Sequence, residues 1–218
     1  MAMTAGAALV DADLNLDTPP DAVESAERRA VPSSADAALA HCFVGDEPGS
    51  FEAVVAAYQD RVTHLAHRLL GWAGGPDVED VVQDVFLAVL RHRRRFRREA
   101  SLSTWLTAIT VNRCRTVQRR LRLLRLLRVR AAGAATGHAS PASDAASADE
   151  TSRRVRQAVA ALPPRDREIV VLRYFEGLSA SDIAGVVGLS TNAVDVRLHR
   201  ARARLAERLG AWHREERS

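Results

Sequence analysis

The stretch Leu178–Leu205, LSASDIAGVVGLSTNAVDVRLHRARARL, decides the fold of the second half of the chain. Ser179, with Asp182 three residues later, is close to a capping box and predicts the start of a short helix. Gly188 follows the apolar positions of that helix, where a helix C-terminus favours glycine. Ser190 predicts the cap of a second helix. Two short helices joined by a glycine-containing turn make a helix-turn-helix.

The second helix of this pair has two contrasting faces. Apolar residues recur on one side at i, i+4, i+7 and i+11, and they are Val194, Leu198, Ala201 and Leu205. The opposite side carries Asn192, Asp195, Val196 and His199, with Arg200 and Arg202 at its edges. Such a mixture of amides, charges and an imidazole suits reading of the DNA major groove. The alternative is a plain helical hairpin with a solvated face, but the caps, the period and the basic edges together favour DNA binding.

Charge is distributed unevenly along the 218 residues. The net charge is +4, and all 31 basic residues are arginine. Residues 1–50 have a net charge of −7, whereas residues 91–130 hold 14 arginines against one glutamate. Residues 131–150 are weakly acidic, and residues 151–218 have a net charge of +5. Two basic blocks separated by an acidic one predict two places that meet a polyanion.

The sequence predicts an all-α fold with two small helical domains joined by a flexible linker. Residues 51–128 form the first domain and residues 151–210 the second, which contains the helix-turn-helix and is followed by a tail at 211–218. The linker, 129–150, is rich in Ala, Ser, Gly and Asp. Fully extended, its last twenty residues, 131–150, reach at most ~70 Å, which corresponds to about two turns of DNA. Residues 1–50 are expected to be a disordered acidic extension, either a dispensable tail or a regulatory arm that masks a basic surface.

The first domain is predicted to contain three helices, at Phe51–Leu70, Asp77–Phe96 and about Leu102–Leu127. In the second of them, valines fill one face, and the opposite face gathers Asp80, Gln83, Asp84 and Leu87. Solvation alone would explain the two aspartates. The leucine among them indicates a surface for a partner.

A basic surface is predicted where the second of these helices ends and the third begins. The run RHRRRFRR, residues 91–98, surrounds Phe96, and the third helix carries a polar stripe that includes Asn112, Arg115 and Arg119. These arginines are candidates for phosphate contacts. Trp105 is expected to lie in the core rather than to stack on a base. In the second domain, helices are expected at Thr151–Leu162 and Arg165–Phe175.

Several classes of protein are disfavoured by what the sequence contains. His64 and His67 lie one turn apart without a suitably spaced third ligand, so no metal is expected. No Gly-rich phosphate loop or nucleophile with a plausible base is present, so neither a cofactor nor catalysis is expected. Cys42 and Cys114 give no disulfide framework, and no stretch approaches the ~20 apolar residues of a membrane span. We therefore expect a cytoplasmic protein without membrane insertion.

In its order and spacing, the chain resembles a bacterial RNA polymerase sigma factor of the extracytoplasmic-function group. The N-terminal residues that carry the resemblance are FEAVVAAYQDRVTHLAHRLLG from Phe51, DVEDVVQDVFLAVLRHRRRF from Asp77 and SLSTWLTAITVNRCRTVQRR from Ser101. The C-terminal match is ALPPRDREIVVLRYFEGLSASDIAGVVGLSTNAVDVRLHRARARL from Ala161. A helix-turn-helix alone is common, but this ordered combination is highly specific.

The resemblance implies a role for each surface. The face of Asp80, Gln83, Asp84 and Leu87 would grip the clamp helices of the β′ subunit of core RNA polymerase, with the β subunit as a further contact. The segment from Phe96 to Arg122 would capture the promoter −10 element, with Asn112 at the family's asparagine and Arg115 and Arg119 on phosphates. The −35 element would be read by Arg173, Asn192, Asp195, Val196, His199 and Arg200. The linker would thread the polymerase channel, and an anti-sigma antagonist would cover these surfaces.

One departure from the family concerns the −35 reader. Related proteins often have Lys or Arg followed by Ser where this chain has Asp195 and Val196. An aspartate cannot bond phosphate or guanine O6, but it can accept a hydrogen bond from cytosine N4. The resemblance therefore does not carry a −35 sequence over to this chain.

The expected function is promoter-specific initiation of transcription without catalysis. The rival interpretation is a helix-turn-helix regulator that binds DNA without polymerase. Such a regulator is usually a dimer on a palindrome. No stretch here resembles a dimerisation module, and the face around Asp80 would then have no role.

Overall fold

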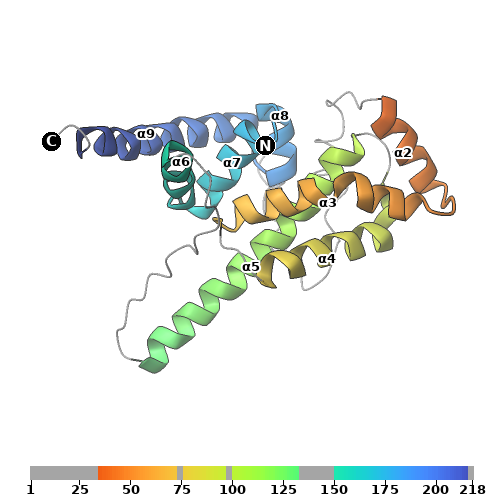
Figure 1. Ribbon diagram of the computed structural model, residues 1–218, viewed down its shortest axis with the longest axis horizontal. Helices are drawn as coiled ribbons and strands as arrows, with labels where there is room; N and C mark the ends of the chain where they lie inside the picture. The colour runs from red at the N-terminus through yellow and green to blue at the C-terminus, as the bar shows by residue number, and fades with distance from the viewer. Residues whose placement is uncertain (1–33, 73–75, 97–99, 133–149, 216–218) are drawn as a thin grey trace, which may run out of the picture.

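The computed structural model describes residues 34–72, 76–96, 100–132 and 150–215. Apart from one short 3-10 turn, every regular element in these ranges is an α-helix, and they contain no strand (Figure 1). The helices form two groups, α2 to α5 and α6 to α9, which correspond to the two predicted domains. No helix within the described ranges is both long and apolar enough to cross a membrane.

The first domain packs four helices around an apolar core. They are α2 (Ser34–Val44), α3 (Ser50–Leu69), α4 (Pro76–His92) and α5 (Leu102–Ala132), with a 3-10 turn at Arg93–Arg95. The valines of α4 lie on its buried side, as their spacing predicted, and Val85 and Val89 are completely buried. Trp105 is also buried, so its expected place in the core is confirmed.

Helix α2 corrects the expected boundary of the first domain. The prediction that residues 1–50 form a disordered extension is wrong for residues 34–50, because Phe43 is fully buried and stacks against Phe51 at 6.5 Å between ring centroids. The local composition concealed this helix, whose stability comes from its apolar contacts with α3 and α5 rather than from a helical period of its own. Residues 1–33 lie outside the described residues.

The start of α5 is capped by a residue that is distant in sequence. The carboxylate of Asp36 on α2 accepts hydrogen bonds from the amides of Leu102 (3.0 Å) and Ser103 (3.3 Å). Ser101 Oγ accepts from the amide of Thr104 at 3.0 Å. The first amides of a helix have no partner within the helix and carry partial positive charge, so a buried carboxylate stabilises this end.

The hydroxyl of Tyr58 on α3 also donates to Asp36. Burial, and then its hydrogen bond to Asp36, raise the pKa of Tyr58, so the hydroxyl stays protonated and able to donate. The single carboxylate thus ties three helices of the first domain together.

Helix α5 is longer than predicted and extends beyond the rest of the domain (Figure 1). It continues to Ala132, four residues into the segment 129–150 that was expected to be linker, while α6 begins at the last residue of that segment. Residues 133–149 lie outside the described residues. The distal part exposes four leucines by 40–59%, and they are Leu123, Leu124, Leu126 and Leu127.

The second domain consists of α6 (Glu150–Ala160), α7 (Pro164–Tyr174), α8 (Ala180–Val187) and α9 (Thr191–Glu215). The predicted helix-turn-helix is α8 and α9. Ser179 and Asp182 form a reciprocal capping box, and Gly188 ends α8 with a φ of 71°, a left-handed conformation that favours glycine. Ser190 Oγ accepts from the amide of Ala193 at 3.2 Å, which caps α9 as predicted.

The two domains pack against each other. Helix α7 contacts α3, and α8 contacts α5 (Figure 1). Buried apolar residues of both domains belong to one continuous cluster. The linker alone did not predict this association.

Candidate polymerase and nucleic-acid interfaces

The candidate polymerase surface lies on the exposed side of α4. Asp80, Gln83 and Asp84 are exposed, and the Leu87 side chain is 47% accessible. Leu90, one turn further on, is 41% exposed and was not singled out from the sequence. The surface therefore combines carboxylates with an uncovered apolar patch, which suits contact with another protein more than simple solvation.

The candidate −35 surface lies along α9. Asn192, Asp195, Val196, His199 and Arg200 are all exposed. On the opposite side, Val194, Leu198 and Ala201 are at most 3% exposed and fix the helix against the domain core. The helical period predicted from sequence therefore gives the correct inward and outward faces.

Arg173, the remaining −35 candidate, is an exposed residue of α7. Its Nη1 donates to the carbonyl oxygen of Leu178 at 2.8 Å, just before the capping box of α8. This bond orients the arginine along the loop that leads into the helix-turn-helix.

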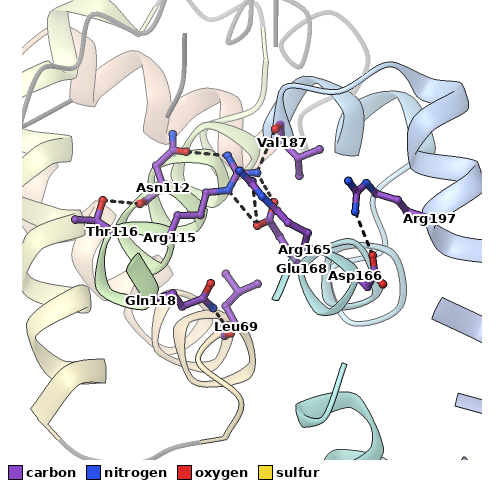
Figure 2. Close-up of polar contacts among 10 residues, drawn as sticks. All are labelled: Leu69, Asn112, Arg115, Thr116, Gln118, Arg165, Asp166, Glu168, Val187 and Arg197. Carbon is purple, nitrogen blue, oxygen red and sulfur yellow. Dashed lines mark hydrogen bonds and ion pairs between the residues drawn. The ribbon is translucent and has the colours of Figure 1, made fainter. Parts of the chain in front are cut away.

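The candidate −10 surface on α5 is partly enclosed. Asn112 and Arg115 are half-buried, whereas Arg119 is exposed. Figure 2 shows Arg115 reaching from α5 to Glu168 of α7 and to Val187 of α8. Its Nε donates to Glu168 Oε2 at 3.0 Å, Nη2 donates to Glu168 Oε1 and to the Val187 carbonyl at 3.1 Å, and Nη1 approaches Asn112 Oδ1 at 3.4 Å.

Phe96 corrects the predicted −10 set. Its side chain is 3% exposed, and its ring lies 5.2 Å from that of Trp105 between centroids. The pair fills the core between the end of the 3-10 turn and α5, so Phe96 is a packing residue here and not a DNA contact. Helix α4 ends at His92, so its helical period does not predict the direction of the Phe96 side chain. The arginines around Phe96 gave no sign that it is buried.

A second charged contact between the domains was not predicted from the sequence. Glu176 follows α7 and binds Arg61 Nε at 3.0 Å and Arg68 Nη1 at 3.4 Å, both on α3. Beside it, the Arg68 guanidinium lies 4.8 Å from the centre of the Phe175 ring, whose edge meets Trp72 at 6.1 Å. Acidic residues within a basic domain were the only sequence signal for this contact.

Asp166 shows that not every buried acid of α7 serves the interface. It pairs with Arg197 at 3.3 Å and with Arg204, both on α9 of its own domain. Glu168, two residues later, points to the first domain instead and also lies 3.8 Å from Arg165. Burial, and then the nearby positive charge of Arg115, lower the pKa of Arg165.

Neither charge of the Arg115–Glu168 pair is well hydrated. The side chains are 10% and 6% exposed. Removal of one partner from such a pair leaves a buried charge uncompensated and costs about 3–5 kcal/mol, although the pair itself contributes much less relative to an apolar contact. The pair therefore fixes which surfaces meet more than it stabilises the fold.

The described part of the chain contains no group of three or more His, Cys, Asp or Glu residues that could hold a metal ion. His64 and His67 are helix residues there. Cys114 is buried, and burial raises the pKa of its thiol, which keeps it protonated and unreactive.

Comparison with known proteins matches both domains. The Sigma-70 region 2 model matches residues 54–124, and the Sigma-70 region 4 model matches residues 152–205. The ECF RNA polymerase sigma factor SigM of Mycobacterium tuberculosis is 32% identical over 175 residues, which cover 80% of this chain and 85% of that protein. The chain belongs to the ECF RNA polymerase sigma factors. It therefore binds core RNA polymerase and directs promoter-specific initiation, and a regulator without sigma activity is not favoured.

Solved structures agree with the fold. CnrH, in complex with the cytosolic domain of CnrY, is 29% identical with a TM-score of 0.59, and the match covers 82% of this chain and 99% of that one. The sigma factor RpoE of Bartonella quintana, in complex with the anti-sigma factor NepR, has a TM-score of 0.61 at 22% identity, with 74% and 98% covered. At that identity the second likeness supports the fold alone.

Proposed function

We propose that three surfaces divide the work of this sigma factor. The face of Asp80, Gln83, Asp84 and Leu87 on α4 binds the β′ clamp helices of core polymerase, and the β subunit adds further contact. Asn112, Arg115 and Arg119 on α5 bind the −10 region. Arg173 and the exposed face of α9 read the −35 element. The main observation in support of this assignment concerns α9. Its candidate −35 residues are all exposed, while the opposite side of the helix is buried.

The chemistry of each surface supports its proposed ligand. Arginines on α5 offer forked N–H donors that match phosphate oxygens, and an asparagine beside them offers both a donor and an acceptor. On α9, Arg200 can donate to guanine or phosphate, and Asp195 can accept from the amino group of cytosine. The proposed −35 site therefore includes a cytosine opposite Asp195.

The protein acts without catalysis of its own and works in the cytoplasm, where RNA polymerase operates. Two of the solved sigma factors above were determined with a second protein bound, one of them named as an anti-sigma factor. We infer the same kind of control here, by an anti-sigma partner that covers the α4 and α9 surfaces.

Run-off transcription on a genomic fragment library, with core polymerase and with or without this protein, tests the assignment. New and discrete start sites are expected, and their alignment gives both promoter elements. Absence of new starts from the full chain, and also from a chain lacking residues 1–33, contradicts the proposal. The deletion stops at residue 33 because α2 belongs to the core of the first domain.

The clamp surface has its own test. Asp80→Arg with Asp84→Arg should weaken core binding by about 100-fold or more, because like charges across an interface cost several kcal/mol. The matched control, Glu52→Arg with Asp60→Arg, makes the same charge change at exposed positions of α3. Equal co-purification of the two variants with core polymerase would exclude α4 as the clamp surface.

A further inference from the structure

Two glutamates of the second domain are buried against arginines of the first. Glu168 binds Arg115, and Glu176 binds Arg61 and Arg68. Their side chains are only 6% and 4% exposed. Residues 151–218 are basic overall, with eight acids against 13 arginines, and two of these acids face arginines of the first domain at this one interface.

Glu168 occupies the position on Arg115 that a phosphate would take. A carboxylate and a phosphate both present paired oxygens to the guanidinium fork, and the two bind arginine with the same geometry. In Figure 2 the fork faces Glu168, and a further N–H donates to the Val187 carbonyl. Promoter phosphate can therefore reach this arginine only by displacing α7 and α8.

The other proposed surfaces are open in the same conformation. On α4, Asp80 and Asp84 are exposed, and on α9, Asn192 and Arg200 are exposed. The domain contact thus covers Arg115 of the −10 surface, while Arg119 of that surface and the other two surfaces stay exposed. A contact that only stabilises the fold would not need Arg115, a residue proposed to bind the −10 region.

We infer that the second domain acts as a reversible block on the −10 surface, held by the contacts of Glu168 and Glu176 with Arg115, Arg61 and Arg68. The free chain can then present its polymerase and −35 surfaces, while Arg115 becomes available only after the domains separate. This inference rests on the proposed −10 role of Arg115.

The charged part of the interface is consistent with reversibility. Charged groups can exchange their partners for water or phosphate, and here they lie beside the apolar cluster that both domains share. Among the described residues, the aromatic contact across the interface is the edge of Trp72 against Phe175, with Arg68 beside the same ring, and Phe175 remains 40% exposed. Seventeen residues join α5 to α6, which allows separations up to about 60 Å.

Glu168→Gln with Glu176→Gln tests the block in the full chain. The change removes both charges but keeps side-chain size and leaves all proposed DNA contacts in place. A matched control, Glu52→Gln with Glu207→Gln, makes the same change in net charge at exposed positions outside the Glu168 and Glu176 contacts. Spin labels on Glu79→Cys of α4 and Ala203→Cys of α9, in a Cys42→Ser background, report the domain separation.

The DNA probe is a fluorescein-labelled single strand of twenty thymidines, which measures phosphate contact without requiring a known promoter. We expect the interface variant to show longer distances between the labels and at least about 5-fold tighter binding than the control, the lower end of ordinary coupling between sites. Arg115→Ala should then weaken binding more in the interface variant than in the wild-type chain, where Arg115 is already occupied.

Unchanged distances between the labels in the interface variant would overturn the inference. Longer distances without tighter oligonucleotide binding than the control would overturn it as well. Start sites in run-off transcription with the wild-type chain decide the proposed function separately, because core polymerase is present there. The inference would also be overturned if the interface variant bound the oligonucleotide more tightly but Arg115→Ala weakened binding equally in the interface variant and in the wild-type chain. The tighter binding would then come from another surface.

Discussion

Helices α5 and α9 are both basic helices proposed to bind promoter DNA, yet they are supported in different ways. The N-terminus of α9 is capped locally by Ser190, and its reader face is open. The N-terminus of α5 is capped by Asp36, which is 66 residues away from Leu102, and its Arg115 is held by the second domain. A charge pattern therefore identifies a candidate surface, whereas tertiary contacts decide whether that surface is available.

The largest difference between the two helices should appear in binding to −35 duplex DNA. Arg200→Ala should weaken binding of the full chain by about 1–3 kcal/mol, because a base or phosphate contact is lost. Arg115→Ala should change the same affinity by less than about 0.5 kcal/mol, because it lies outside the −35 surface. Fluorescence anisotropy with a promoter fragment taken from the run-off alignment measures both. Equal losses would break the distinction between the surfaces.

The two capping arrangements should differ in energetic weight. Asp36→Ala should lower the stability of the first domain by about 1–2 kcal/mol, because it removes a buried charged acceptor from two helix amides. Ser190→Ala removes one exposed cap and should cost the second domain about 0.5–1 kcal/mol. Hydrogen exchange of the first amides of α5 and α9, read by mass spectrometry, reports each effect. Unchanged protection of Ser103 and Thr104 in Asp36→Ala would show that Ser101 alone suffices.

The smallest expected effect concerns the pKa of His92, the last residue of α4, which lies near several arginines. Burial, and then Arg95 and Arg113, lower the pKa of His92 from its ordinary value of 6.5. A histidine with a lowered pKa in the folded state contributes stability that is present above about pH 6.5 and is lost as pH falls through the folded value. NMR titration, with the signal assigned by His92→Gln, should give a midpoint below 6.5. A midpoint above that value would mean that the arginines around it are better neutralised than the structure indicates.

Much of the fold follows from local patterns. The period of Val194, Leu198 and Ala201 gave the inward face of α9, and the Ser179–Asp182 pair gave the start of α8. These predictions succeed because capping and helical periodicity depend on residues within a few positions of one another. The α4 face with Asp80 and Leu87 was found in the same way.

The failures concern interactions between distant residues. Helix α2 lies in an acidic, small-residue segment, and its stability depends on Phe43 entering a core made by other helices. The family resemblance assigned Phe96 to the −10 element, but its ring packs against Trp105 in the core. Glu168 and Glu176 gave no signal beyond being acids in a basic domain, since their partners lie more than 50 residues away.

The sequence by itself determined the two helical domains, the helix-turn-helix and the three candidate surfaces, because periodicity, caps and charge blocks are local properties. Only the tertiary structure decided that α2 belongs to the first domain, that Asp36 caps α5, and that Glu168 occupies Arg115. The physical reason is that burial and ion pairing depend on which surfaces meet in space. The separation of two residues along the chain does not specify which surfaces are in contact.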